Sequence, residues 1–331
     1  MRILILSVLF ELFFFTNIIA GSNNRVADSN YFVSYRDKLQ LSLIGVVKFN
    51  SFDIHEKEKP KDDFGFSTNE NFNIGFGCNY KWLGVNLAFN LPAYNSDDTL
   101  YGKTMGTDIQ VDLHTDKWIF NATAIYYSGF YWQNPDDFYS NWSVEDSVVI
   151  HPDVSSVLLS VSGLRSFKYD KISLRSVFVG NEVQLKSAGS FIAGWQASLY
   201  GMNSDFPIIP EELISQYPNI GRTRKLSSLT LGFSFGYVYT HVFRNKMFAN
   251  IAFMPGINAQ TVTTREYDKF KPYVKPGLST KMHLRAGVGY QTDVQYMGFM
   301  FIGDSYNLKT DFDTRYRYSY GKIKIYYGVR F

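Results

Sequence analysis

The stretch that decides the fold runs from residue 229 to residue 240 and reads LTLGFSFGYVYT. It alternates between large apolar or aromatic side chains and small or polar ones. The first set is Leu231, Phe233, Phe235, Tyr237 and Tyr239, and the second is Thr230, Gly232, Ser234, Gly236 and Thr240. Because successive side chains of a β-strand point to opposite sides, this period of two predicts a strand with one apolar face and one polar face.

The same alternation returns along the chain and predicts an all-β fold. Near the start it places Leu39, Leu41 and Leu43 opposite Lys38, Gln40 and Ser42. Further on it places Ile109, Val111 and Leu113 opposite Gln110, Asp112 and His114, and Leu284, Ala286, Val288 and Tyr290 opposite His283, Arg285, Gly287, Gly289 and Gln291. Soluble β-sandwiches also alternate, so the pattern alone does not indicate a membrane protein.

Composition narrows the class of protein. The 331 residues carry a formal net charge of +3, and 18% of them are aromatic, with 29 Phe, 24 Tyr and 5 Trp. Aromatic rings favour strands and the polar boundary of a bilayer, and the small net charge gives no reason to expect a nucleic-acid partner. Cys78 is the only cysteine and the five histidines are scattered. We therefore predict no disulfide, no metal site and no cofactor.

The first 20 residues have the features of a secretory signal peptide. Arg2 supplies the positive start, residues 3–15 form an apolar core, and Ala20 is a small residue at a cleavage position. This core is shorter than the roughly 20 residues of a membrane helix. We expect a signal peptide at 1–20, a short lead at 21–34 and a single β-barrel domain at 35–331.

Strand length and the spacing of turns indicate a transmembrane antiparallel β-barrel. The expected strands have roughly 10 to 17 residues, whereas soluble strands have about 5 or 6 and tilted membrane strands about 9 to 11. Short periplasmic turns alternate with long outer loops in outer-membrane barrels. Short turns are predicted near 80–82, 115–117, 168–171, 243–246 and 292–293, and long loops near 53–68, 91–105, 131–152, 202–225, 262–277 and 304–319.

These turns and loops separate about 12 strands, with 10 to 14 possible. The assignment makes residues 171–202 a single pass, although they are too long for a simple strand. Within them, the polar stretch 181–190 is either a bulge or excursion of one wall strand, or a turn.

The last strand carries a signal for barrel assembly. Ile323, Ile325, Tyr327, Val329 and the terminal Phe331 alternate with polar or small residues. An aromatic terminal residue in this phase resembles the signal that the outer-membrane barrel assembly machinery reads. We predict that Tyr327, Val329 and Phe331 form this signal, that the assembly machinery and outer-membrane lipid are the partners, and that the protein lies in the cell outer membrane.

Three segments resemble an uncharacterised family of exported proteins. They are Tyr101-Gly102-Lys103-Thr104, Tyr127-Ser128-Gly129-Phe130-Tyr131, and Gln184-Leu185-Lys186-Ser187-Ala188-Gly189-Ser190 with Gly194. The family is domain of unknown function 4421 from Bacteroidota, and the resemblance extends from about Tyr35 to Phe331. It implies an exported, barrel-like protein and brings no catalytic residues with it.

A nucleophile is conceivable at Lys186, Ser187 and Ser190, because a serine needs a nearby base to lose its proton. His151, His241 and His283 are possible partners, but none has the sequence spacing that the chemistry requires. We expect instead a structural bulge in which Gly189 permits an unusual backbone turn.

Basic and polar residues on the non-apolar face of the late strands are predicted to face the lumen. A basic lumen favours anions if it lines a pore. Alternatively, the charges pair with acids such as Asp112 and plug the barrel. The candidates are Arg175, His283, Arg285, Gln291, Lys322, Lys324 and Arg330.

We expect a non-enzymatic outer-membrane barrel that serves as a narrow channel, a binding surface or a structural component of the wall. Two alternatives stay open: an outer-membrane lipid hydrolase of the phospholipase type, and a soluble periplasmic β-barrel that binds a small apolar ligand. The external ligand is unknown. The long loops that hold Trp132, Trp142, Phe206 and Tyr217 are the predicted contact surface for a partner.

Overall fold

The computed structural model describes residues 30–331 apart from 57–62, 70–71, 82, 91–97, 116, 140–141, 143–147, 179–181, 222, 267–272 and 311–313. The predicted signal peptide at 1–20 lies outside the described residues, as do residues 21–29 of the predicted lead. In the described part of the chain, no helix is both long enough and apolar enough to cross a bilayer.

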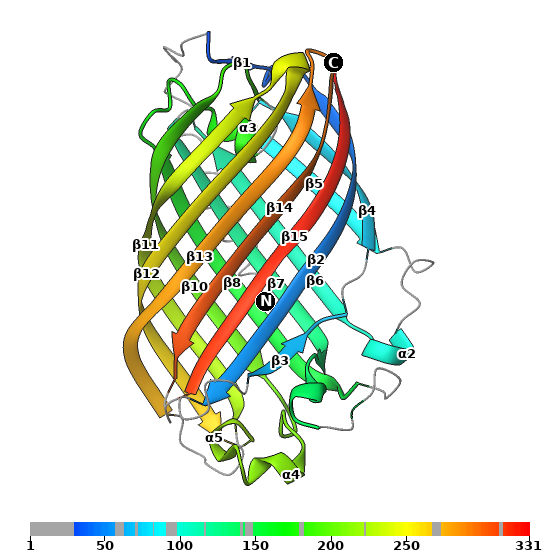
Figure 1. The fold of residues 1–331 in the computed structure, drawn as a ribbon, viewed down its shortest axis with the longest axis vertical. Coiled ribbons are helices and arrows are strands. Elements are labelled where there is room, and N and C mark those ends of the chain that lie inside the picture. Colours follow the sequence, from blue (N-terminus) through cyan, green and yellow to red (C-terminus); the bar gives the residue numbers. More distant parts are fainter. Residues whose placement is uncertain are drawn as a thin grey trace, which may run out of the picture.

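Antiparallel strands close into one barrel, as the alternation predicted (Figure 1). Each strand of the closed ring pairs with the next, and β15 pairs with β2 to complete it. The ring has ten strands: β2 (Gln40–Glu56), β3 (Phe64–Ser67), β7 (Trp118–Trp132), β8 (Ile150–Ser166), β10 (Ala188–Asn203), β11 (Thr223–Val242), β12 (Met247–Glu266), β13 (Tyr273–Gln291), β14 (Gln295–Lys309) and β15 (Thr314–Arg330).

Three further strands, β4, β5 and β6, widen the wall toward one end of the barrel. The short strand β3 bridges β2 and β7 only near one end of the barrel. Toward the other end, β4 (Phe72–Tyr80) pairs with β2, β5 (Leu83–Asn90) pairs with β4, and β6 (Met105–His114) pairs with β7. In the half of the barrel toward this other end, β4, β5 and β6 take the place of β3, so twelve strands surround it. Twelve lies within the predicted range of about 10 to 14.

The outer surface of the wall is apolar. On β11, Phe233 is 76% exposed, whereas Thr230 on the opposite face is fully buried, which confirms the predicted phase. The outward faces of β10, β12 and β13 also carry exposed large apolar side chains, among them Leu199, Ile257 and Leu278. A closed sheet leaves no edge along most of the wall, and an apolar outer face is what lipid requires.

The two ends of the barrel differ as predicted. One end, the turn end, carries the turns after β4, β6, β11 and β13, with η3 (Arg244–Lys246) in the third of them. The other, the loop end, carries α2 (Asp98–Tyr101), η2 (Pro135–Asp137), α4 (Glu211–Ile214) and α5 (Pro218–Gly221). In Figure 1 the loop end is at the bottom, and the carboxyl terminus is at the top.

Two of the predicted long loops are wrong. Strand β12 continues to Glu266 and β13 begins at Tyr273, so most of 262–277 is strand. Likewise β14 continues to Lys309 and β15 begins at Thr314, so most of 304–319 is strand. These parts of the wall carry β-branched and aromatic residues, which favour strands. They alternate in the reverse sense, because Tyr316 and Tyr318 point inward and are buried whereas Arg317 between them is exposed.

The predicted single pass over 171–202 is correct in that the segment holds one wall strand, β10, but its predicted extent is wrong. Strand β10 begins only at Ala188. The predicted turn at 168–171 is present. The amides of Lys171 and Ile172 both donate to the Lys168 carbonyl oxygen, at 3.1 and 3.0 Å. The chain then forms α3 (Leu174–Phe178) and β9 (Glu182–Gln184), and β9 pairs with β1 (Phe32–Ser34). We call the described residues of 167–187 the plug, which lies at the turn end beside β1 (Figure 1).

The plug packs against the inner face of the wall. Ile172, Leu174 and Val177 are buried in a cluster with inward residues of β7, β10, β11 and β12. The polar excursion inside the predicted strand is therefore a segment that folds into the lumen. Its apolar side chains are buried there, which a turn exposed to water would not allow.

Aromatic rings fill the lumen toward the loop end. Tyr200 on β10 stacks on Tyr318 of β15 with ring centroids 4.0 Å apart, and Tyr318 stacks on Tyr306 of β14 at 4.7 Å. The hydroxyls of Tyr200 and Tyr316 are 2.7 Å apart, which closes a hydrogen bond across the lumen. We call this set the aromatic layer: Phe52, Phe66, Phe130, Tyr200, Tyr306, Tyr316 and Tyr318.

Candidate functional site

A cavity of about 150 Å³ lies inside the barrel. It is bounded by Tyr320, which packs with the aromatic layer, and by Phe178 of the plug. A cavity of about this volume takes in a benzene-sized molecule. Unlike an apolar cavity, this one is lined mostly by polar side chains, which β5, β6, β7, β8, β13 and β15 direct inward.

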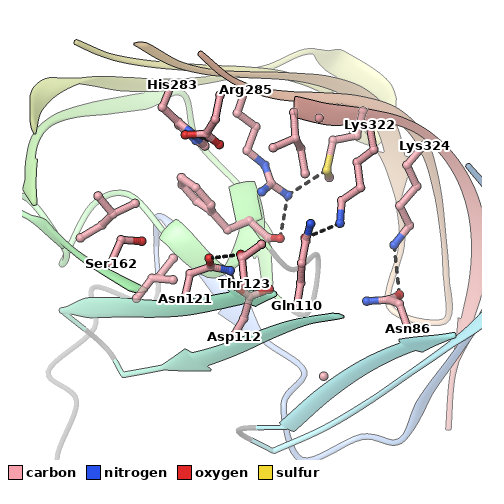
Figure 2. A pocket seen from close by; sticks show the side chains of 18 of the residues that line it. Asn86, Gln110, Asp112, Asn121, Thr123, Ser162, His283, Arg285, Lys322 and Lys324 are labelled. Carbon is pink, nitrogen blue, oxygen red and sulfur yellow. Dashed lines mark hydrogen bonds and ion pairs between the residues drawn. The ribbon is translucent and has the colours of Figure 1, made fainter. Parts of the chain in front are cut away.

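Arg285 lies at the centre of the polar lining. Its guanidinium donates to the Phe178 carbonyl at 2.7 Å and approaches the Met300 sulfur at 2.8 Å (Figure 2). The guanidinium also lies over the Phe178 ring, 4.6 Å from its centroid. The Nε atom of Arg285 is buried without a hydrogen-bond partner. The side chain is 5% exposed, so its charge is held away from bulk water by neutral groups.

Two lysines of β15 reach across the lumen. Lys322 Nζ donates to Gln110 Oε1 of β6 at 2.5 Å, and Lys324 Nζ donates to Asn86 Oδ1 of β5 at 3.1 Å. Figure 2 shows both side chains extending from one side of the wall toward the amides on the other. Both partners are neutral, so neither ammonium is charge-compensated by the group it contacts.

The acids of the cavity are already engaged. Asp304 lies 3.0 Å from Lys281 and 3.0 Å from His283, both on the neighbouring strand β13. Asp112 accepts a hydrogen bond from Asn121 at 2.7 Å. No carboxylate in the described part of the chain lies within 4.0 Å of the charged nitrogens of Arg285, Lys322 or Lys324.

The lining therefore has an excess of positive charge. Four basic side chains, Lys281, Arg285, Lys322 and Lys324, face two acidic ones, Asp112 and Asp304, an excess of two before His283 is counted. Burying a charge without a counter-charge is costly, and the cost is relieved when an anion supplies the missing partner.

The other predicted lumenal residues lie elsewhere. Arg175 lies on the helix α3 of the plug and not on a wall strand, with its Nε 4.0 Å from Glu182. Gln291 is buried at the turn end of β13. Arg330 donates to the Thr292 carbonyl at 2.5 Å and lies over the rings of Tyr35 and Tyr296, 4.9 and 4.5 Å from their centroids. Of the predicted set, the cavity thus brings together His283, Arg285, Lys322 and Lys324.

The predicted nucleophile cluster is divided. Ser190 is buried, accepts a hydrogen bond from the Lys168 amide at 2.9 Å and donates to the Phe191 carbonyl at 2.7 Å. Lys186 lies over the Tyr31 ring, 5.4 Å from its centroid. Ser187 is brought to 3.4 Å from His241 Nδ1, a proximity that sequence spacing did not indicate. The Ser187 oxygen also accepts a hydrogen bond from the Val242 amide at 2.9 Å.

The predicted assembly signal lies on the outward side of β15. Tyr327 and Phe331 are exposed, and Phe331 is 68% exposed. The Phe331 amide donates to the Leu39 carbonyl at 2.8 Å, so the terminal residue continues the pairing of β15 with β2.

Two of the loop aromatics predicted to meet an external partner are buried instead. Trp132 is fully buried against Phe64 and Phe138, and Tyr217 meets the same two rings edge-on. Burial removes these large apolar rings from water. Phe206 remains exposed.

Sequence reasoning missed several residues of the cavity. Lys281 shares its face of β13 with His283 and Arg285, and the period of two could have identified it. Asp304 was assigned to a long loop, and Asn86 and Phe178 gave no signal. Within the described part of the chain, no group of three or more His, Cys, Asp or Glu side chains could hold a metal ion.

A closed antiparallel barrel with an apolar outer face and a polar, partly filled lumen defines the class of transmembrane β-barrels. The chain belongs to the family described as "Domain of unknown function (DUF4421)", whose model matches residues 26–331. This match agrees with the resemblance carried by the three segments. A search of curated proteins finds no match.

Solved structures of outer-membrane barrels resemble the fold at low identity. The outer membrane protease OmpT from Escherichia coli has a TM-score of 0.41 and 8% identity, covering 90% of this chain and 98% of that one. The toluene transporter TodX from P. putida has a TM-score of 0.25 and 9% identity, covering 89% and 90%. OmpT of Vibrio cholerae has a TM-score of 0.28 and 9% identity, covering 86% and 97%. None of these likenesses transfers an activity or a site residue to this chain.

Proposed function

We propose that the protein is a non-enzymatic outer-membrane β-barrel, exported by the signal at 1–20, that binds an anion inside a lumen closed to free diffusion. The observation that carries this proposal is the cavity in which Arg285, Lys322 and Lys324 contact only neutral groups. The apolar wall supports the membrane location and disfavours the soluble periplasmic alternative.

Closure of the lumen is supported at both ends. Toward the loop end, the aromatic layer packs across the full width of the barrel, as the contact between Tyr200 and Tyr318 shows. Toward the turn end, α3 of the plug fills the lumen and Phe178 reaches the cavity. A solute that enters from either end meets packed side chains, so a permanently open channel is disfavoured.

The chemistry of the cavity favours a small anion. A guanidinium offers several fixed donors to an oxyanion or a carboxylate, and the two ammonium groups offer mobile ones. The unpartnered Nε of Arg285 is one donor that such an anion could satisfy. The volume suits a carboxylate, phosphate or sulfate group and excludes a large polyanion.

Two measurements on the full-length protein test this function. In a planar bilayer we expect no steady conductance, and a steady current would overturn the closed lumen. By titration calorimetry in detergent we expect inorganic phosphate, sulfate or acetate to bind, and Arg285→Gln to weaken that binding at least tenfold. The matched control is Lys309→Met, because Lys309 is exposed at the end of β14. If none of the three anions binds, the proposed function is wrong.

A second candidate function is a lipid hydrolase. The contact between Ser187 and His241 favours it, because a histidine at hydrogen-bond distance could take the serine proton. The pair is exposed, and its 3.4 Å separation is long for a working base. Release of fatty acid from phospholipid vesicles tests this alternative. Activity that survives Ser187→Ala would exclude the assignment.

A further inference from the structure

In the described part of the wall, one pair of neighbouring strands is not hydrogen-bonded. Strands β5 and β6 follow each other in the chain and lie next to each other at the turn-end half of the wall. Strand β5 pairs only with β4, and β6 pairs only with β7, within the described residues. Among the described residues, the strands at every other junction of the twelve-strand half are hydrogen-bonded to each other. We call this junction the seam, defined by Leu83–Asn90 and Met105–His114.

The cavity reaches the seam from inside. Gly84 and Asn86 of β5 and Gln110 and Asp112 of β6 belong to the cavity lining. The two lysines of β15 each contact one side of the seam, Lys324 through Asn86 and Lys322 through Gln110. Two residues apart on one strand, they are separated by about 7 Å along it. Two ammonium groups therefore flank the inner mouth of the seam (Figure 2).

The outer side of the seam is apolar. Leu87 and Phe89 of β5 are 59% and 65% exposed, and Ile109 of β6 is 58% exposed. Val111 and Val85 are also exposed on the same outer surface. This composition is typical of a wall at hydrocarbon depth. A path through the seam thus leads from two cations to lipid within the thickness of the wall.

We propose that the bound anion is the head group of a single-chain amphiphile, whose hydrocarbon chain leaves the lumen through the seam into the membrane. This inference rests on the proposed function and names its ligand class: a carboxylate, phosphate or sulfate ester with one long alkyl chain. Lys322, Lys324 and Arg285 hold the head group, and the chain passes between β5 and β6.

Two features favour an amphiphile over a free anion. The aromatic layer and the plug obstruct the lumen toward both ends, so the seam offers the shorter route to the cations. The unpaired strand edges are also costly in hydrocarbon, and the wall bears this cost only where the cavity meets lipid. A wall that merely enclosed a soluble anion would be more stable with β5 and β6 paired.

The full-length protein in lipid nanodiscs tests the inference. The probe is hexadecanoate with a diazirine midway along its chain, and the matched control is the corresponding hexadecanol with the same diazirine. After irradiation, peptide mapping locates the adducts. We expect hexadecanoate to label residues 83–90 and 105–114 at least fivefold above the neutral alcohol. This comparison needs no variant of the protein.

The double variant Lys322→Met/Lys324→Met should abolish the excess labelling, whereas Lys309→Met should retain it. Heat-dependent gel mobility confirms that each variant is folded. If the alcohol labels the seam as strongly as hexadecanoate, the labelling is mere lipid contact and the inference is wrong.

The outcomes separate this inference from the proposed function. If acetate or phosphate binds in an Arg285-dependent way but hexadecanoate gives no excess at the seam, the ligand is a free anion and only the inference fails. If no anion binds in any form, both fail. If a polypeptide strand cross-links to the seam and excludes hexadecanoate, the seam is a strand-docking site and the inference is overturned.

Discussion

The aromatic layer and the cavity beside it occupy neighbouring parts of one lumen but are built in opposite ways. In the aromatic layer each ring packs on another ring of the layer, as Tyr200 does on Tyr318. In the cavity, Arg285 and the two β15 lysines contact only neutral groups. Side chains that pack on one another contribute stability, whereas buried cations without a counter-charge are expected where a ligand binds.

The largest effect is expected in the aromatic layer. Tyr318→Ala removes a ring that is 2% exposed and stacked on both Tyr200 and Tyr306. Truncating a buried aromatic residue costs about 4 kcal/mol in the free energy of unfolding. Denaturant unfolding in lipid vesicles measures it. Phe206→Ala is the control, because Phe206 is exposed in a loop and should change stability by less than about 0.5 kcal/mol. Equal losses in both variants would contradict the comparison.

The next effect separates paired from unmatched lysines within the cavity. Lys281→Met leaves Asp304 buried without its ammonium partner at 3.0 Å, which should cost about 3 kcal/mol in the free energy of unfolding. Lys322→Met removes a cation whose partner is the neutral Gln110, and we expect no loss of stability or a small gain. The same unfolding measurement compares the two. A loss of similar size in both would show that Lys322 is charge-compensated after all.

A smaller effect concerns the plug. The Gln184 amide accepts a hydrogen bond from the Ser173 amide at 3.1 Å and donates to the carbonyls of Lys171 and Lys186 at 2.7 and 3.1 Å. Gln184→Ala removes these bonds, each of which contributes about 1 kcal/mol or somewhat less, so the plug should be weakened by about 2 kcal/mol. Hydrogen exchange of the amides at 172–178 should accelerate about thirtyfold, which is the same free energy expressed as a rate. Gln295→Ala, at the exposed first position of β14, should leave the exchange rate unchanged.

Much of the wall could be predicted from the sequence, because the period of two is a local property. The phase at Phe233 and at Leu284 depends only on the alternation within each strand, and the structure confirms it. The plug could not be predicted in this way. Gln184 stabilises it through contacts with residues 171 to 186, and β9 pairs with β1, which lies about 150 residues away in the chain. Contacts between residues so far apart in the chain leave no periodic pattern in the sequence.

The structural roles of the three family segments are also visible only in the folded protein. Gly129 has a φ of +87° at a register shift between β7 and β8, and a Cβ there would clash with the Lys103 carbonyl oxygen. Thr104 donates to the Gly129 carbonyl at 2.8 Å. Two of the segments thus form one structural contact beside β6, and the third holds the plug. For the third segment the sequence predicted only a bulge at Gly189, and this prediction is wrong, because Gly189 pairs with Tyr239 in a regular β10–β11 register. The contacts that these segments make depend on residues that lie close only after folding.

The smallest effect is expected at the loop end, beyond the aromatic layer, where side chains contact water. The Tyr139 hydroxyl donates to Glu212 Oε1 of α4 at 2.9 Å. Desolvation, and then this hydrogen bond, raise the pKa of Tyr139 to about 12 from its ordinary value of 10.0. A backbone hydrogen bond, and then the bond from Tyr139, lower the pKa of Glu212. Glu212 is exposed and Tyr139 is only partly buried, so the contribution to stability is small and screened by salt.

The signs of the two shifts define the pH window of this contact. Because the pKa of Tyr139 is raised on folding, its contribution is complete below about pH 10 and is lost as the pH rises through about 12. Because the pKa of Glu212 is lowered, its contribution is present above the ordinary value of 4.5 and is lost as the pH falls through the folded value. Glu212→Gln should therefore move the pKa of Tyr139 back toward 10, as followed by NMR of labelled tyrosine. The neighbouring Glu211→Gln should not move it, and an unchanged pKa of Tyr139 in Glu212→Gln would mean that burial alone sets its value.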